Sequence, residues 1–285
     1  MRTALITTVA GRTAHLRRQT ADVGRLPRRP DRQVVVAMGE GEAERARPAC
    51  ATSADLLEVP VERGELPLAA ARNAGAARAI AGGAELLVFL DVDCLPGPGL
   101  LARYAAAADD GALLCGPVAY LPPAPPGGYP RDLTGLAAPH PARPVPPADV
   151  VLPGGDHRLF WTLSFAVTAA TWTHLGGFDP GYVGYGGEDT DFGQRARAAG
   201  VDLRWVGGAW AFHQHHPTAT PPVQHLDAIL RNAARFHARW GWWPMEGWLQ
   251  AFAADGLARF DPVDGTWCAT AKSGPSRDAR SIPGA

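Results

Sequence analysis

Residues Leu86 to Gly97 read LLVFLDVDCLPG, a run of large apolar residues that ends in two aspartates separated by a valine. A continuous apolar run of this kind is typical of a strand that is buried on both faces. The preceding stretch, LPLAAARNAGAARAIAGG (Leu66 to Gly83), is rich in alanine and closes on two glycines that can end a helix. A helix that leads directly into a doubly buried strand predicts a layered α/β fold.

The N-terminal residues repeat this alternation. TALITTVA (Thr3 to Ala10) and QVVVAM (Gln33 to Met38) are β-branched runs, and between them His15, Leu16 and Gln19 have a helix-compatible spacing. Strand, helix and strand in this order predict one mostly parallel central sheet with helices on both faces. In such sheets ligands bind beyond the carboxyl ends of the strands, which is where Asp91 and Asp93 fall.

The two aspartates predict a metal site. We expect the strand to continue through them, so that both side chains project to one face while Val92 projects to the other. Two ionised carboxylates in a small space repel each other unless a cation lies beside them, and Mn²⁺ or Mg²⁺ with substrate phosphates would complete such a site. The alternative is that both are turn residues ahead of the LPGPG sequence.

A second acidic group follows a glycine-rich loop. The sequence GGFDPGYVGYGGEDTDFGQRARAAG (Gly176 to Gly200) places Glu188, Asp189 and Asp191 at the predicted start of a helix. Acids in a first helical turn complement the helix dipole by about 0.3–1 kcal/mol each, which accounts for one or two of them. The glycines before them permit a ligand to approach the backbone closely, so this motif is also a candidate functional site.

Three histidines follow the next predicted strand. WAFHQHHP places His213, His215 and His216 directly after the strand, and several histidines at a strand end favour a ligand role over a purely structural one.

Charge and composition exclude several classes of protein. A formal net charge of −1 argues against sequence-independent binding to nucleic acid, which requires a basic face. The four cysteines lack the paired spacing of a zinc site or a disulfide framework, so we expect reduced thiols and a cytoplasmic protein. No stretch has the roughly 20 apolar residues of a membrane span, and no targeting segment is recognisable.

Four motifs in order resemble the glycosyltransferases of the GT-A fold, especially the branch that includes β-1,4-galactosyltransferases, bacterial chondroitin and hyaluronan polymerases, and polypeptide N-acetylgalactosaminyltransferases. The motifs are ARNAGA (71–76), FLDVDCLP (89–96), GGFDPGYVGYGGEDTDF (176–192) and FHQHHP (212–217). The resemblance extends from Leu5 to about Phe260. It implies a nucleoside diphosphate sugar donor, with UDP as the expected nucleotide, a carbohydrate or other hydroxyl-bearing acceptor, and Mn²⁺ or Mg²⁺ as cofactor.

The resemblance also implies roles for individual residues. Asp189 would be the catalytic base of a reaction that inverts the anomeric centre. The metal ligands would be Asp93 and His213, with His215 or His216 as a further ligand. The nucleotide-sugar site would include Arg12, Arg72, Asp91, Val92 and Asp93. The acceptor site would include Tyr185, Gly187, Glu188 and Asp191, of which Glu188 and Asp191 have the helix start as their alternative role.

Four regions follow from these assignments. Residues 1–118 form the expected nucleotide-sugar-binding half, and residues 119–156 form a proline-rich connection or lid. Residues 157–262 form the acceptor-binding and catalytic half, and residues 263–285 form a tail that we expect to be disordered. The segment that closes over the donor is either Pro117 to Gly155 or the loop Gly181 to Gly187.

The chain departs from the family pattern at two positions that border the sugar and acceptor pockets. Tyr185 stands where the galactosyltransferases have tryptophan, and LFWTLS (Leu159 to Ser164) replaces their aromatic–glycine stretch. The identities of the donor sugar and the acceptor therefore do not follow from the resemblance. Two other functions remain open, a metal-dependent hydrolase of nucleotide sugars or phosphoesters, and a catalytically silent carbohydrate-binding module.

Overall fold

A computed structural model describes residues 1–217 and 219–270. The chain forms two compact units, Met1–Thr218 and a second unit that begins at Ala219. The predicted half 1–118 belongs to the first unit, whereas the predicted half 157–262 is divided, with residues 157–217 in the first unit and residues 219–262 in the second. None of the helices in the described residues is long and apolar enough to cross a bilayer.

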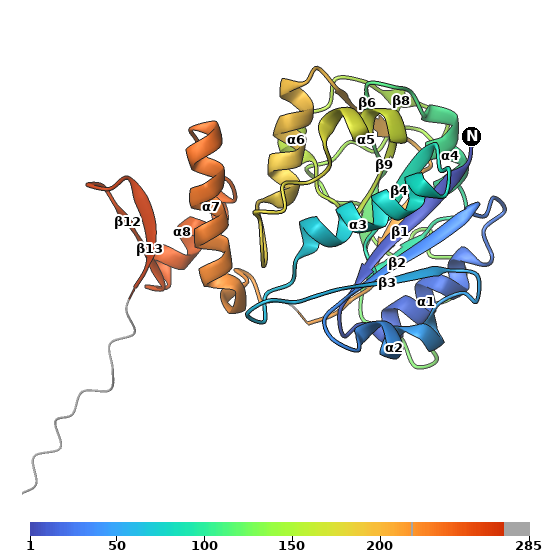
Figure 1. The fold of residues 1–285 in the computed structure, drawn as a ribbon, viewed down its shortest axis with the longest axis horizontal. Helices are drawn as coiled ribbons and strands as arrows, with labels where there is room; N and C mark the ends of the chain where they lie inside the picture. The colour runs from blue at the N-terminus through green and yellow to red at the C-terminus, as the bar shows by residue number, and fades with distance from the viewer. Residues whose placement is uncertain (218, 271–285) are drawn as a thin grey trace, which may run out of the picture. The chain divides into compact units, whose positions relative to one another are not determined.

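The first unit is built on an eight-stranded sheet with the order β3-β2-β1-β4-β9-β6-β10-β8 (Figure 1). Parallel pairing joins β3 to β2, β2 to β1, β1 to β4 and β6 to β10, whereas β9 and β8 run antiparallel to their neighbours. The predicted mainly parallel α/β fold is thus confirmed. The strands are β1 (Thr3–Val9), β2 (Arg32–Met38), β3 (Asp55–Val59), β4 (Leu86–Leu90), β6 (Ala112–Cys115), β8 (Val151–Leu152), β9 (Ser164–Thr168) and β10 (Asp202–Val206).

Helices cover both faces of this sheet because the central strands are apolar on both sides. In β4, Leu87 and Phe89 face one hydrophobic cluster, while Leu86, Val88 and Leu90 face another. The first face is covered by α3 (Leu68–Ala81), α5 (Ala169–Leu175) and α6 (Glu188–Ala198); the second is covered by α1 (Thr13–Val23), α2 (Glu42–Ala46) and α4 (Leu100–Ala107) (Figure 1). Short 3₁₀ turns span Arg47–Ala49 and His157–Leu159.

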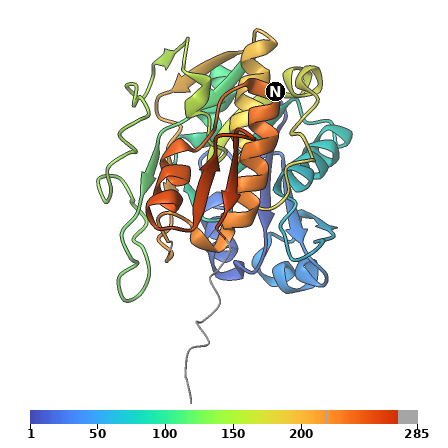
Figure 2. The same cartoon turned by 90° about the vertical axis from the view of Figure 1, so that its left-hand side faces the viewer.

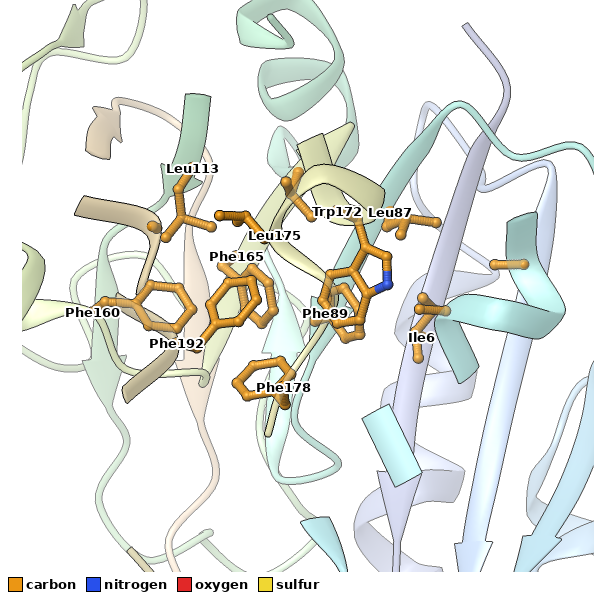
Figure 3. Close-up of a cluster of buried hydrophobic side chains, with 14 of the residues drawn as sticks. Ile6, Leu87, Phe89, Leu113, Phe160, Phe165, Trp172, Leu175, Phe178 and Phe192 are labelled. Carbon is orange, nitrogen blue, oxygen red and sulfur yellow. The ribbon is translucent and has the colours of Figure 1, made fainter. Parts of the chain in front are cut away.

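Aromatic side chains fill the layer between the sheet and the helices α5 and α6 (Figure 3). Phe89 stacks on Phe165 and on Trp172, with ring centroids 4.5 and 4.9 Å apart. Phe178 and Phe192 stack at 4.4 Å in the same cluster. Large rings that interdigitate in this way fix the position of α6 on the sheet, and with it the acidic residues at its start.

A small sheet branches from the large one. It has the order β5-β11-β7, formed by Cys94–Pro96, Ala211–His213 and Val118–Tyr120. The parallel pair β6 and β10 continues beyond a bend as the parallel pair β7 and β11. Glycines make the bend possible, because a Cβ at Gly116 would overlap the carbonyl oxygen of Ala209, and one at Gly207 would overlap that of Pro147.

The proline-rich segment between β7 and β8 has almost no regular structure, as its proline content predicts (Figure 2). Hydrogen bonds to other elements of the first unit nevertheless hold it in place. Arg18 of α1 donates hydrogen bonds to the carbonyl oxygens of Tyr129 and Pro130 at 2.9 and 3.1 Å. Arg143 donates to those of Leu159 and Trp161 at 2.8 and 3.0 Å.

The second unit has its own hydrophobic cluster. It contains a 3₁₀ turn (Val223–His225), α7 (Leu226–Trp240), α8 (Glu246–Ala254), and a hairpin of β12 (Ala258–Asp261) and β13 (Thr266–Ala269). The predicted disorder of residues 263–285 is wrong for β13, where Thr266–Ala269 pair in antiparallel register with β12. The rest of that prediction, from residue 271, lies outside the described residues.

Candidate active site

The aspartates of the DVD motif lie in a turn directly after β4, and our prediction that they continue the strand is wrong. The backbone N–H of Cys94 donates to the carbonyl oxygen of Asp91 at 2.8 Å and closes the turn. Val92 packs into the core beside Val9 and Leu16. Because the chain turns here, Asp91 and Asp93 approach different partners instead of facing each other across one strand.

Gln19 of α1 holds this turn in place. Its amide nitrogen donates to the carbonyl oxygens of Asp91 and Cys94, both at 2.8 Å, and its amide oxygen accepts from the Thr7 hydroxyl at 2.9 Å. The helix was predicted from the sequence, but the role of Gln19 was not. A glutamine on the inner face of a helix belongs to no recognisable motif.

Asp93 lies at the centre of a group of basic side chains. One carboxylate oxygen is 3.5 Å from Nε2 of His213 and 3.4 Å from Nε2 of His216, and Arg12 forms an ion pair with it. Burial would raise the pKa of Asp93, but the hydrogen bonds with the two histidines and the charge of Arg12 hold the pKa far below its usual range. This carboxylate is therefore ionised at neutral pH.

Backbone pairing brings the histidines to this carboxylate. In the small sheet His213 of β11 stands opposite Cys94 of β5, the residue that follows Asp93. The backbone N–H of Gln214 donates to the carbonyl oxygen of Asp93 at 2.6 Å. His213, at the predicted end of this strand, is thus placed beside Asp93 by the pairing of β11 with β5.

His215 is not part of this group, which corrects its predicted place beside His213. Its side chain is exposed, and its backbone N–H donates to the Tyr129 hydroxyl at 3.0 Å. His216, the alternative, takes the position beside Asp93. The chain leaves the strand after His213, so the spacing of the next two histidines alone does not determine which one turns inward.

The donor set of Asp93, His213 and His216 fits a divalent metal ion. One ligand atom from each residue lies within 4.8 Å of the others, and each of the three residues is partly exposed. Among the residues that the structure describes, no other group of three ligating side chains meets this distance. Two imidazoles and one carboxylate favour a transition metal such as Mn²⁺ over Mg²⁺, which prefers oxygen ligands alone.

Arg72 joins the DVD turn to the start of α6. Its guanidinium is 3.3 Å from Asp91 and 3.2 Å from Glu188, and donates to the Thr162 hydroxyl at 2.9 Å. The side chain is only 4% exposed, so it is not the freely accessible diphosphate contact that the resemblance implied. Instead, its positive charge compensates the charges of Asp91 and Glu188, and it links the DVD turn to the start of α6.

The three acids of α6 have different surroundings. Gly187 precedes the helix with a φ of +89°. Asp191 is fully buried and accepts hydrogen bonds from Arg195 at 3.1 Å and from the Tyr182 hydroxyl at 3.3 Å. An acceptor therefore has no access to Asp191, and the predicted acceptor contact is corrected to a structural role. Glu188 is also buried, against Arg72.

Asp189 is the acid of this motif that forms no ion pair within the described residues. It is half-buried, and within the described ranges its carboxylate accepts hydrogen bonds from Thr190 alone, at 2.7 Å from the N–H and 3.3 Å from the hydroxyl. Burial, followed by the negative charge of Glu188, raises the pKa of Asp189 to about 7. A carboxyl group with this pKa can take up and release a proton near neutral pH.

Tyr185 lies in the field of both acidic motifs. Burial and then the charges of Asp189 and Glu188, followed by those of Asp91 and Asp93, raise the pKa of its phenol to about 12. The DVD turn and the start of α6 therefore contribute to one electrostatic environment.

Comparisons with known sequences identify similar glycosyltransferases. Residues 156–217 match a family described as the N-terminal domain of galactosyltransferase. Validoxylamine A glucosyltransferase of Streptomyces hygroscopicus subsp. limoneus is 28% identical, over 79% of this chain and 54% of that protein. The enzyme of the same name from subsp. jinggangensis (strain 5008) is 30% identical, over 59% of this chain and 44% of that protein. The chain spans about half the length of these relatives.

Solved structures with a similar fold include GalNAc-T7 in complex with UDP, GalNAc and Mn²⁺, with a TM-score of 0.55 and 15% identity over 90% of this chain and 57% of that one. Residues 1–349 of TarS from S. aureus, in complex with UDP-GlcNAc, give a TM-score of 0.53 and 12% identity over 83% of this chain and 67% of that one. The fold is the GT-A fold of glycosyltransferases, and the predicted resemblance is confirmed.

Proposed function

We propose that this chain is a metal-dependent, inverting glycosyltransferase that moves a sugar from a UDP-sugar to the hydroxyl group of an acceptor. The observation that carries the proposal is a pair of dissimilar acidic sites on a GT-A fold. Asp93 converges with His213 and His216 in a donor set that fits a divalent ion, while Asp189 has a pKa raised to about 7 and forms no ion pair among the described residues.

Asp93, His213 and His216 would hold the metal. When bound, the ion supplies positive charge that neutralises the departing nucleoside diphosphate. Arg12 is partly exposed beside the same carboxylate, so its guanidinium is available to the phosphates as well. Asp91 remains about a quarter exposed beside Arg72, which suits a contact to the ribose of the donor.

Asp189 would be the general base. It takes the proton from the attacking hydroxyl of the acceptor, which is a poor nucleophile while it is protonated. If the acceptor attacks from the side opposite the leaving diphosphate, the anomeric centre is inverted. Glu188 contributes through its charge, because a neighbouring carboxylate makes Asp189 a stronger base.

The names of the similar proteins support the classes of donor and acceptor that we propose for this chain. The names of the two Streptomyces proteins describe glucosyl transfer to validoxylamine A, and two structures of similar fold were determined with UDP or UDP-GlcNAc. We therefore expect a UDP-sugar donor and an acceptor that carries sugar-like hydroxyl groups.

Of the two candidate lids, we propose the loop Gly181 to Gly187. Arg18 and Arg143 hold the proline-rich segment, and Tyr182 and the N–H of Gly184 hold part of the loop, whose glycines at residues 184, 186 and 187 have positive φ and lie next to Asp189 in the sequence. We expect UDP and Mn²⁺ together to slow limited proteolysis within this loop. Slowing confined to the proline-rich segment would assign the lid there instead.

The experiment that tests the proposed function measures sugar transfer by the purified chain. UDP-glucose, UDP-galactose and UDP-GlcNAc are each supplied with validoxylamine A or simple glycosides, with Mn²⁺ or with EDTA, and products are identified by mass spectrometry. We expect transfer that depends on both Mn²⁺ and an acceptor. Release of free sugar at the same rate with and without acceptors would support the hydrolase alternative, and UDP binding without any turnover would support the silent module.

A further inference from the structure

A series of ring side chains leads away from the proposed metal site. Tyr120 of β7 stands opposite His213 of β11, and their ring centroids are 5.0 Å apart. His140 of the proline-rich segment lies 6.1 Å from Tyr120, and Trp161 lies 4.8 Å from His140 in a perpendicular arrangement. We refer to Tyr120, His140 and Trp161 as the aromatic wall. Three separate segments of the chain contribute to it.

Arg143 holds the outer end of the aromatic wall. Its guanidinium lies 4.7 Å from the ring centre of Trp161 and 5.4 Å from that of Trp205. It is only 5% exposed and also donates to the backbone carbonyl of Trp161. A cation stacked on the indole and bonded to the same residue's backbone limits rotation of Trp161, so this ring is held in place before any ligand binds.

Polar groups on the aromatic wall are available for hydrogen bonding. Tyr120 is 43% exposed, and no group in the described part of the chain bonds to its hydroxyl. A phenol hydroxyl can both donate and accept a hydrogen bond. His140 accepts from the N–H of Ala142 at Nδ1, at 3.2 Å, and burial lowers its pKa. A neutral ring with that acceptor carries its proton on Nε2, which no described group accepts.

We propose that the aromatic wall is a binding subsite for a sugar ring or a related cyclitol. Such rings have an apolar C–H face that packs on aromatic side chains and hydroxyl groups at the edge that require hydrogen-bond partners. Tyr120 and His140 supply both kinds of contact. The Tyr120 ring is next to His213, and the His140 ring is next to Tyr120. The inference rests on the proposed function, because it places a ring beside the site of transfer.

The bound ring has two possible sources, the sugar of the donor and the acceptor. The two are distinguished by measuring binding of UDP and UDP-glucose with Mn²⁺ by calorimetry, and binding of methyl α-D-glucopyranoside and myo-inositol in the presence of UDP and Mn²⁺ by saturation-transfer NMR. A ring on the donor side makes UDP-glucose binding sensitive to the aromatic wall while UDP binding is not. A ring on the acceptor side makes the NMR signals sensitive.

Three variants test the aromatic wall. Tyr120→Ala removes the ring and the hydroxyl, Tyr120→Phe removes only the hydroxyl, and His140→Ala removes the second donor. Leu136→Ala is a matched control in the same segment, since Leu136 is 40% exposed, and His174→Ala is a control for an exposed histidine on α5. Melting temperature and circular dichroism establish that each variant is folded.

We expect Tyr120→Ala to weaken binding of the sugar ring about 10-fold and Tyr120→Phe and His140→Ala to weaken it less, because each retains part of the contact. UDP affinity and both controls should remain at the wild-type value. Unchanged ring binding in Tyr120→Ala would overturn the inference, as would an equal loss of UDP binding, which would assign Tyr120 to the metal site. A wild-type chain that binds the rings but transfers no sugar would contradict the proposed function and leave the subsite standing.

Discussion

Asp93 and Asp189 are both acids of short motifs in the same unit, yet their surroundings are opposite. Two histidines and Arg12 approach Asp93, and its pKa is held far below the usual range. Asp189 forms no ion pair in the described residues and has a neighbouring acid in Glu188, and its pKa rises to about 7 in spite of the more distant charge of Arg72. The first environment keeps a carboxylate permanently charged, and the second makes proton exchange possible.

Arg72 makes this difference possible. Without a cation between them, the acids of the DVD turn and of α6 would all repel one another. Arg72 forms ion pairs with Asp91 and Glu188, and within the described residues it reaches Asp189 only through its charge, not through an ion pair. The difference therefore depends on which acid is left out of the ion pairs, and four predictions test it.

The largest effect is expected on transfer by Asp189→Asn. Asparagine keeps the size of the side chain and can accept from Thr190, but it does not take a proton at neutral pH. The rate of transfer should fall by about 10²–10⁴-fold, because base catalysis is lost, with UDP and Mn²⁺ affinity unchanged. Transfer assays and calorimetry on one preparation measure both. Near-normal transfer would exclude Asp189 as the base, and joint loss of UDP binding would move it into the metal site.

Asp93→Asn should have the converse effect on binding. The neutral amide is a poorer metal ligand, so Mn²⁺-dependent UDP affinity should fall by about 10–100-fold. The matched control is Asp22→Asn on α1, which removes a carboxylate that is also paired with arginine but lies outside the site. UDP affinity that is insensitive to both EDTA and Asp93→Asn would contradict the metal assignment.

The pH profile of transfer should show the raised pKa directly. A base acts when ionised, so kcat/KM should rise about 10-fold per pH unit below about 7 and level off above it. Glu188→Gln removes the neighbouring charge and should move this limb to lower pH. A limb near pH 4 in the wild-type chain, or one that Glu188→Gln leaves in place, would assign it to another group.

The smallest effect is expected on stability. Because the folded pKa of Asp189 is raised, the folded chain retains a proton that the unfolded chain has lost between about pH 4 and pH 7. The contribution of this residue to stability is therefore greatest at low pH and falls through that window. Asp189→Asn removes the cost of the buried charge, so its melting temperature should exceed that of the wild type by about 2–6 °C at pH 8 and match it near pH 4. A lower melting temperature at pH 8 would mean that the ionised carboxylate stabilises the fold.

The central strands and the helices were predictable because their signals are local. Doubly apolar runs such as β4 and the alanine-rich α3 specify their own conformation wherever they are packed. The same signals do not indicate strand direction, and the antiparallel β9 was not foreseen. They also do not indicate where a strand ends, which is why the DVD turn was predicted as part of β4.

The site was less predictable than the fold. The motifs identified Asp93 and His213, which the structure brings together, but their roles stay predictions. Gln19 and Thr162 were missed, because a buried polar side chain is recognisable only when its partner is known. His216 and His215 differ only in their position in an irregular loop, where spacing gives no orientation.

The bend at Gly116 and Gly207 has a consequence for mutational scanning. Neither residue has a functional group, yet any side chain at either would collide with a carbonyl oxygen of a neighbouring segment. That bend carries β11, and so His213, to the edge of the DVD turn. Alanine at either glycine should abolish activity as thoroughly as alanine at Asp93. A scan of tolerated substitutions would therefore rank Gly116 and Gly207, which have no functional group, as intolerant as the residues proposed to bind metal and transfer the proton.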